Sequence, residues 1–361
     1  MSLERINQVF HPERPVVKKG LLFGRTTEVA KTVAHLETVG GHVLLCGQRG
    51  IGKTSIARVA EALLREKHGS VVVAYVTCDQ RISFDRIIGM IFAEAKLGNI
   101  AIDQVPPSFV AAALSEVEGF VLIDEAERLA HADRLLIAEL MKCLSDHSAK
   151  FSVCVIGVAR TALDLFHQHP SVQRCLNEIP IRGLQKRDIQ ALIEDGFAAL
   201  EQKIRPDTVL DIVRLSRGFP AYAVAICHHL AQTVHTSQKS TASPTDLCDA
   251  LEEYLRGNGA GAFAVLRRVL AVGERGAKRD LLLASSYIDD DEFTLEQISA
   301  SAVQFTDGTR EPTDAMLTDL CIDGPTKVFD IVVPGIYTFN NPRMSMIIQA
   351  HDFVQRNRSA G

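Results

Sequence analysis

The sequence predicts an α/β fold in which helices flank a parallel sheet, followed by an all-α segment and a C-terminal module of helices and a hairpin. Between residues 40 and 183, short apolar runs alternate with helical patterns, the order of strand, crossover helix and parallel strand. Beyond Gly183 these runs stop and helical patterns continue, until two β-rich runs appear near the C-terminus.

Composition limits the class of protein. A length of 361 residues predicts two or three domains, and 47% hydrophobic with 23% charged residues is typical of a globular protein. Apolar runs are too short for a membrane span, and the first ten residues lack the apolar block of a secretory signal, so we expect a cytoplasmic location. Eight scattered cysteines without a CxxC pair predict reduced thiols rather than a zinc site.

The strands and helices follow in order along the chain. The predicted strands are apolar throughout because helices cover both faces of the sheet; they are residues 42–46, 71–76, 120–123 and 151–156. Helical patterns come next at 185–202, 206–216 and 222–233, and residues 235–244 are expected to form a loop. Further helical patterns occupy 262–272, 278–287, 295–303 and 312–321, before runs 328–333 and 336–339. Pro334-Gly335 separates these two runs, which predicts a hairpin and a winged-helix-like module.

The strongest motif lies between the first strand and the helix after it. It matches G-x-x-x-x-G-K-[ST], the P-loop or Walker A pattern, in the segment Gly47-Gln48-Arg49-Gly50-Ile51-Gly52-Lys53-Thr54. Glycines let backbone N–H groups approach phosphate oxygens at the helix N-terminus. Lys53 is predicted to reach the β and γ phosphates and Thr54 to bind Mg²⁺, with Ser55 closing the nucleotide-binding segment.

A second motif ends the strand at residues 120–123, about seventy residues further on. Asp124 and Glu125 follow this apolar run, as in a Walker B motif. At the carboxyl edge of a parallel sheet, Asp124 is predicted to hold Mg²⁺ and Glu125 to act as general base on the attacking water. The two motifs together predict a parallel P-loop NTPase sheet that binds ATP with Mg²⁺.

These residues resemble the additional-strand P-loop ATPases, near the origin-recognition (Orc1/Cdc6-like) AAA+ proteins and the STAND signalling ATPases. The resemblance covers about residues 20–235 and includes Ala74 to Cys78, similar to the second strand of origin-recognition ATPases. It implies that the Leu22 to Arg25 segment borders the adenine, with Arg25 in the nucleotide site; the alternative is a glycine turn before a helix. The implied domains are an N-terminal extension (1–20), the ATPase domain (21–183), a helical lid (184–257) and the winged-helix-like domain (258–361).

Three further positions carry family roles with open alternatives. Arg160 is similar to the STAND arginine that touches the γ-phosphate, unless it is a solvated loop residue, while Gly157 departs from the polar residue usual near the end of that strand. Pro220 lies in a GxP-like turn that would direct a lid helix toward the nucleotide, unless it simply starts a helix. Arg174 is a candidate trans finger, in competition with Arg160, Arg182 and Arg187.

Three functions fit this pattern: a slow ATP-hydrolysing switch that couples nucleotide state to protein assembly or signalling, a DNA-acting ATPase that uses the winged helix, and a nucleotide-binding adaptor. The adaptor is disfavoured because binding alone does not need Glu125. Residues 277–361 carry seven basic and thirteen acidic side chains, a net charge of −6, which disfavours DNA as the partner. The predicted recognition helix offers Asp314 and Asp319 but no lysine or arginine. The basic residues at 267, 268, 275, 278 and 279 could form a basic stripe outside that helix; the alternative is a solvated helical face. The partners expected are therefore ATP or ADP and another protein or a second copy, with no membrane.

Overall fold

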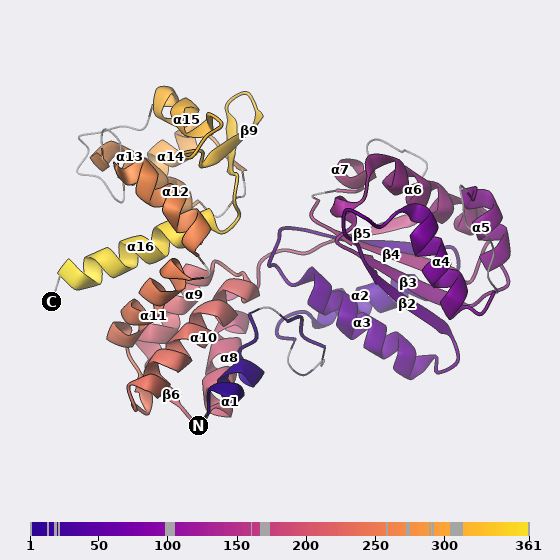
Figure 1. The fold of residues 1–361 in the computed structure, drawn as a ribbon, viewed down its shortest axis with the longest axis horizontal. Helices are drawn as coiled ribbons and strands as arrows, with labels where there is room; N and C mark the ends of the chain where they lie inside the picture. Colours follow the sequence, from indigo (N-terminus) through magenta and orange to yellow (C-terminus); the bar gives the residue numbers. More distant parts are fainter. Residues whose placement is uncertain are drawn as a thin grey trace. The chain divides into compact units, whose positions relative to one another are not determined.

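The computed structural model forms two compact units, Glu13–Asp188 and Met1–Pro12 together with Ile189–Gly361. Figure 1 shows its helices and strands in chain order. The structure describes residues 2–12, 14–17, 20, 22–97, 105–159, 161–166, 174–257, 259–271, 275–288, 290, 292–303 and 313–359. Among these residues, no helix combines the length and the apolar character that crossing a bilayer demands.

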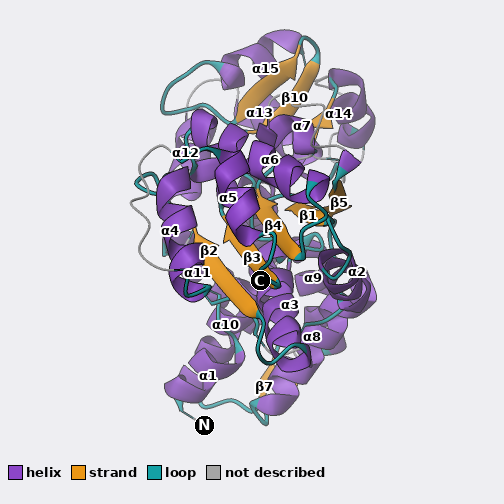
Figure 2. Cartoon of the chain, turned by 90° about the vertical axis from the view of Figure 1, so that its right-hand side faces the viewer, coloured by secondary structure: helices purple, strands orange, loops and turns teal. Residues whose placement is uncertain are grey.

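Unit Glu13–Asp188 is built around a parallel five-stranded sheet in the order β2-β3-β4-β1-β5, which confirms the predicted fold class (Figure 2). Its strands are β1 (His42–Cys46), β2 (Val72–Thr77), β3 (Gly119–Asp124), β4 (Phe151–Gly157) and β5 (Leu176–Pro180). Its helices are α2 (Thr26–Leu36), α3 (Lys53–Lys67), α4 (Phe84–Glu94), α5 (Pro107–Leu114), the 3-10 turn η2 (Ala126–Arg128), α6 (His131–Asp146) and α7 (Ala162–Phe166).

Helices cover both faces of this sheet, as the continuous apolar runs predicted. On one face, Leu44, Val121 and Val153 pack in a single core with residues of α4, α5 and α6. Helices α2 and α3 lie together on the other face (Figure 1). Side chains alternate between the two faces along each strand, so Tyr75 of β2 and Asp124 of β3 share a face of the sheet.

The other unit is mainly helical. Its helices are α1 (Leu3–Val9), α8 (Lys186–Ala199), which begins at the unit boundary, α9 (Pro206–Ser216), α10 (Pro220–Thr236), α11 (Pro244–Arg256), α12 (Ala260–Ala271), α13 (Arg275–Ser286), α14 (Leu295–Ala302), α15 (Asp314–Cys321) and α16 (Met344–Ser359). Strands β8 (Glu292–Phe293), β9 (Phe329–Val333) and β10 (Ile336–Phe339) form an antiparallel sheet in the order β8-β10-β9. The predicted hairpin is therefore present, and β8 adds a strand to it.

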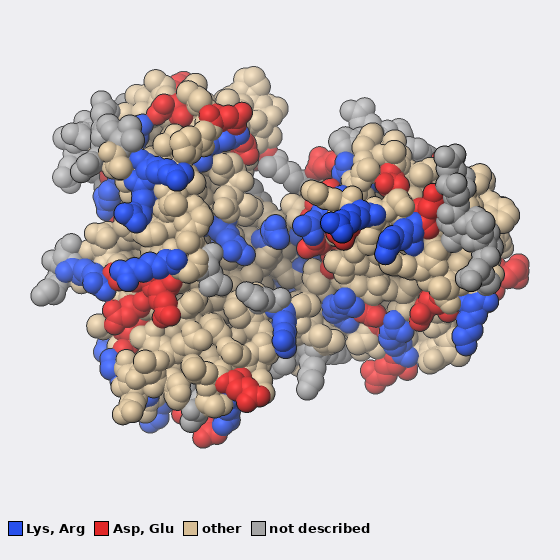
Figure 3. Space-filling model, viewed as in Figure 1, with Lys and Arg blue, Asp and Glu red and all other residues tan. Residues whose placement is uncertain are grey.

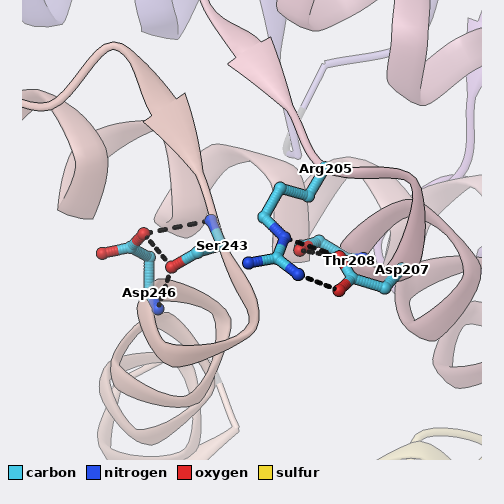
Figure 4. A network of polar contacts seen from close by, with 5 residues as sticks. All are labelled: Arg205, Asp207, Thr208, Ser243 and Asp246. Carbon is cyan, nitrogen blue, oxygen red and sulfur yellow. Dashed lines mark hydrogen bonds and ion pairs between the residues drawn. The ribbon is translucent and has the colours of Figure 1, made fainter.

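A short parallel pair and two polar networks fix the starts of α9 and α11. Strand β6 (Lys203–Ile204) pairs with β7 (Thr241–Ala242), so the stretch 235–244 is not only a loop as predicted. After β7, the Ser243 hydroxyl caps α11 and the Asp246 carboxylate accepts from the Ser243 N–H in return (Figure 4). After β6, Arg205 forms an ion pair with Asp207 at the start of α9.

Candidate nucleotide site

The P-loop connects β1 to α3 through three glycines with positive φ. The φ angles are 147° at Gly47, 83° at Gly50 and 103° at Gly52. A Cβ at Gly47 would lie 2.6 Å from the carbonyl oxygen of Ile181, and backbone cannot move aside cheaply. Only glycine fits there, which leaves backbone N–H groups accessible to an anion.

Helix α3 begins without a capping side chain. Its N-cap is Gly52, which has no side chain to offer the N–H groups of the first turn. A phosphate could accept those hydrogen bonds, and the helix dipole favours its negative charge. Thr54 is partly exposed in the same turn, and Ile51 is buried beneath the loop. Gln48 is partly exposed and Arg49 is exposed along it.

The P-loop lysine folds back over the loop. Lys53 is 8% exposed and its Nζ donates to the carbonyl oxygens of Gly47 (2.7 Å) and Gln48 (2.8 Å). Burial lowers the pKa of Lys53, and the negative charges of Glu127 and then Asp124 oppose that shift. An ammonium held by two neutral carbonyls can exchange them for phosphate oxygens, which make stronger charge-assisted hydrogen bonds.

Asp124 ends β3 with a buried carboxylate that is 3% exposed. Its Oδ2 accepts from the Tyr75 hydroxyl at 2.6 Å and its Oδ1 from the Glu125 N–H at 2.9 Å. Burial, followed by the charge of Asp124, raises the pKa of Tyr75, so this hydroxyl keeps the proton it donates. Arg58 lies over the Tyr75 ring, with its guanidinium carbon 3.3 Å from the centroid.

The donor set fits Mg²⁺. A hydroxyl at Thr54 and a carboxylate at Asp124 are the oxygen ligands that this ion prefers, and phosphate oxygens and water usually complete its shell. The glycine cradle beside them fits a polyphosphate for the reasons given above. The residues present therefore suit a nucleotide bound with magnesium.

The predicted general base has a partner of its own. Glu125 adopts a left-handed conformation, with φ of 55° and ψ of 40°, and starts the turn η2. Its Oε2 accepts from Arg128 Nη1 at 2.7 Å, and both side chains are partly exposed, at 36% and 50%. The structure thus places Glu125 directly after Asp124, with its carboxylate bound to Arg128.

A further acid emerges from the same turn. The Glu127 Oε2 accepts from the backbone N–H of Val158 at 3.0 Å, just beyond β4. The preceding residue is Gly157, where a Cβ would lie 3.3 Å from that oxygen. Sequence reasoning missed Glu127 and Tyr75. Strand alternation could have indicated Tyr75, because every second residue of β2 lies on the face of the sheet that carries Asp124. The η2 turn that directs Glu127 has no such pattern in the sequence.

Arg25 and Ser55 both contact backbone. Arg25 is 3% exposed, and its Nη2 donates to the carbonyl oxygens of Ile51 (3.0 Å) and Arg182 (2.6 Å), while Nη1 pairs with Glu28 at 3.0 Å. It therefore braces the P-loop against the segment after β5. The Ser55 hydroxyl accepts from the Val16 N–H at 3.1 Å. A contact of Arg25 with the adenine stays a prediction.

Three further predicted positions, Arg160, Arg174 and Pro220, are not among the contacts described above. Arg160 lies outside the described residues. Arg174 is described and exposed, within the unit that holds the P-loop. Pro220 belongs to the other unit, where it is the first residue of α10 after the positive-φ residues Arg217 and Gly218. The roles of these residues at the nucleotide stay predictions.

Acidic partners occupy several of the basic side chains in the second unit. Lys278 pairs with Asp319 of α15 at 2.7 Å, and Arg279 pairs with the buried Asp352. Arg358 of α16 contacts Glu252 of α11 at 2.8 Å. Figure 3 shows blue and red side chains side by side over α16 and α11. Of the five residues of the candidate basic stripe, two are thus paired, and the side chain of residue 275 is not described.

Comparisons with known proteins agree with the predicted fold. Residues 37–166 match a family model described as an AAA domain. The structure is similar to Cdc6p from Pyrobaculum aerophilum, with a TM-score of 0.56 and 17% identity, covering 97% of this chain and 98% of that one. It is also similar to the Walker-type ATPase of Pyrococcus abyssi, with a TM-score of 0.57, 16% identity and coverage of 94% and 99%.

A further similar structure is the ORC1 protein of Aeropyrum pernix, solved in complex with DNA. Its TM-score is 0.54 and its identity 16%, over 97% of this chain and 98% of that one. At these identities the likeness shows the fold alone. No curated protein sequence matches the chain.

Proposed function

We propose that the chain binds and slowly hydrolyses ATP, and that its nucleotide state controls protein assembly or signalling. Residues 37–166, which match a family model described as an AAA domain, support this proposal. The observation that carries this proposal is the P-loop itself. Three glycines with positive φ, an uncapped helix N-terminus and the buried ammonium of Lys53 converge on one loop. Asp124, whose charge acts on Lys53, and the adjacent Glu125 are the acids that would serve magnesium and water activation.

Each residue has one task in this proposal. Backbone N–H groups of the P-loop and Lys53 hold the phosphates, and Thr54 and Asp124 hold Mg²⁺. Bound Mg²⁺ would supply positive charge that offsets charge on the phosphates. Tyr75 fixes the Asp124 carboxylate, and Glu125 takes a proton from the attacking water. Products of the reaction are ADP and phosphate.

Glu125 must leave Arg128 before it can act on water. The two side chains are too exposed for a strong pair, so the interaction contributes at most about 1 kcal/mol. Release at that cost lowers the population of free Glu125 by a factor of about five. A rate much slower than typical enzymes would therefore need another cause, such as assembly of several subunits.

The second unit supplies the response in this proposal. Residues 184–257 act as the helical lid, with Pro220 as a phosphate-sensing position, and Arg160 of the ATPase domain is a further phosphate-sensing position. Residues 258–361 form the winged-helix-like domain. Its exposed apolar strand residues, Ile331, Val332 and Val333, suit a protein partner better than a nucleic acid. Lys278 is unsuited to a phosphate contact because its ammonium group already pairs with Asp319.

A DNA-acting ATPase is the second candidate. Its support is the likeness in fold to proteins solved with DNA, the Aeropyrum pernix ORC1 protein and the Drosophila ORC. A protein that neutralises DNA phosphates loses affinity steeply with salt. DNA-stimulated turnover that falls steeply with salt would favour this candidate over the switch.

The test compares ATP turnover of the wild-type protein and of Glu125→Gln, with and without DNA. Glu125→Gln should keep ATP affinity and lower turnover about 100-fold or more, because the amide cannot accept the proton. Glu66→Gln is the matched control, since Glu66 is an exposed residue of α3. Turnover in Glu125→Gln equal to that of the control would reject Glu125 as the base. No turnover and no ATP binding by the wild type would reject the function.

A further inference from the structure

The turn after Asp124 sends Glu127 back toward the P-loop. Glu125 is left-handed, and residues 126–128 form a single 3-10 turn directly after β3. The Glu127 side chain then reaches β4, the neighbouring strand, and accepts from the Val158 N–H at 3.0 Å. This hydrogen bond fixes the carboxylate at the end of β4.

The end of β4 lies beside the start of the P-loop. Strands β1 and β4 are paired in parallel, with Cys46 opposite Gly157. The residue after β1 is Gly47, the first glycine of the P-loop, and the residue after β4 is Val158, the donor to Glu127. The Glu127 carboxylate is therefore held next to the loop that would carry the phosphates.

Gly157 provides the room for this arrangement. A Cβ there would lie 3.3 Å from the Glu127 Oε2 and 3.5 Å from Leu165, closer to the oxygen than ordinary contact allows. A larger side chain at this position would push the carboxylate away. Position 157 therefore has no polar side chain of its own, and the carboxylate of Glu127, from the neighbouring turn, lies there instead.

The charge of Glu127 acts on the P-loop lysine. Among the acids whose charge raises the pKa of Lys53, Glu127 has the largest effect and Asp124 the next. Lys53 is the group expected to reach the β and γ phosphates. A carboxylate that favours the ammonium also repels a phosphate bound to it, and the repulsion is stronger for the more highly charged nucleotide.

We propose that Glu127 sets the nucleotide preference of the site: its carboxylate, fixed by the Val158 N–H beside the P-loop, weakens binding of a nucleoside triphosphate relative to the diphosphate. This inference rests on the proposed nucleotide binding and goes beyond it. Asp124 and Glu125 serve magnesium and water, whereas Glu127 acts through its charge and shifts the preference of the site toward the diphosphate. A weaker hold on the triphosphate lets the diphosphate compete for the same site.

The test measures the ratio of two dissociation constants by calorimetry in the presence of Mg²⁺, for ADP and for the non-hydrolysable β,γ-imido analogue of ATP. The full-length variants are Glu127→Gln, Glu127→Asp and the exposed control Glu66→Gln. Glu127→Gln keeps an oxygen for the Val158 N–H and loses only the charge, so the ratio should shift at least threefold toward the triphosphate. Glu127→Asp keeps the charge and should stay closer to the wild type.

Three results would overturn the proposal. A ratio in Glu127→Gln equal to that of Glu66→Gln would show that the charge does not reach the phosphates. An equal change in both dissociation constants would show a general effect on the loop rather than a preference. In both cases nucleotide binding itself would stand. Absence of binding by the wild type would instead reject the proposed function, and the role of Glu127 with it.

Discussion

His42 makes the stability of the nucleotide-binding unit depend on pH. It starts β1, is fully buried, and uses both ring nitrogens: Nδ1 accepts from the Val153 N–H at 3.0 Å, and Nε2 donates to the Met141 carbonyl oxygen at 2.8 Å. This pattern requires the neutral ring, and burial lowers the pKa of His42 from 6.5 to about 4. Protonation therefore favours the unfolded chain.

The sign and size of the effect follow from these two pKa values. Between pH 6.5 and 4 the unfolded chain binds a proton that the folded chain does not, so stability falls as the pH is lowered through this range. The loss is about 2 kcal/mol at pH 5 and approaches about 3 kcal/mol below pH 4. Above pH 7 this residue contributes no pH dependence.

Urea unfolding at pH 8 and pH 5 measures this effect, with His42→Gln as the comparison. Glutamine has a donor and an acceptor but does not titrate, so it should remove about 2 kcal/mol of the loss between the two pH values, whatever its stability at pH 8. Subtracting the loss of stability in the variant from the loss in the wild type removes the contributions of the other titrating groups. An equal loss in wild type and variant would refute a neutral, buried His42.

Three substitutions test the site. Gly47→Ala places a Cβ 2.6 Å from a backbone oxygen and should weaken ATP binding at least tenfold by calorimetry; unchanged affinity would contradict the cradle geometry. Tyr75→Phe keeps the ring under Arg58 but removes the hydroxyl donor to Asp124, and should lower the free energy of unfolding by about 1.5–3 kcal/mol in urea; a loss under 0.5 kcal/mol would count against this hydrogen bond. Arg128→Ala should change stability by less than about 1 kcal/mol in the same assay, because the pair with Glu125 is partly exposed, and a larger loss would show a role for Arg128 beyond that pair.

The sheet and the P-loop were predictable because their signals are local. Apolar runs gave the strands β1 to β4, and the glycine spacing with Lys53 gave the loop and the start of α3. Both signals, the apolar runs and the glycine spacing, depend on a few residues that are neighbours in the sequence. The parallel order of strands then brings Asp124 to the edge of the sheet where the P-loop lies.

What the sequence did not predict depends on pairing and turns. The contact of Tyr75 with Asp124 needs the register of β2 against β3, and the short strand β7 forms only because β6 lies beside it. The ion pair of Glu125 and the direction of Glu127 follow from one left-handed residue, at a position where nothing in the sequence requires it. Arg25 shows the same limit, since its two carbonyl partners lie 26 and 157 residues away.

Calorimetric titration of ATP into the wild-type protein and Lys53→Ala, with and without Mg²⁺, tests the central claim most directly. The account predicts saturable binding by the wild type that strengthens with Mg²⁺ and weakens at least tenfold in Lys53→Ala, with urea unfolding as a check that the variant folds. Absence of binding by the wild type, or equal affinity in a folded Lys53→Ala protein, would contradict a nucleotide held by this loop.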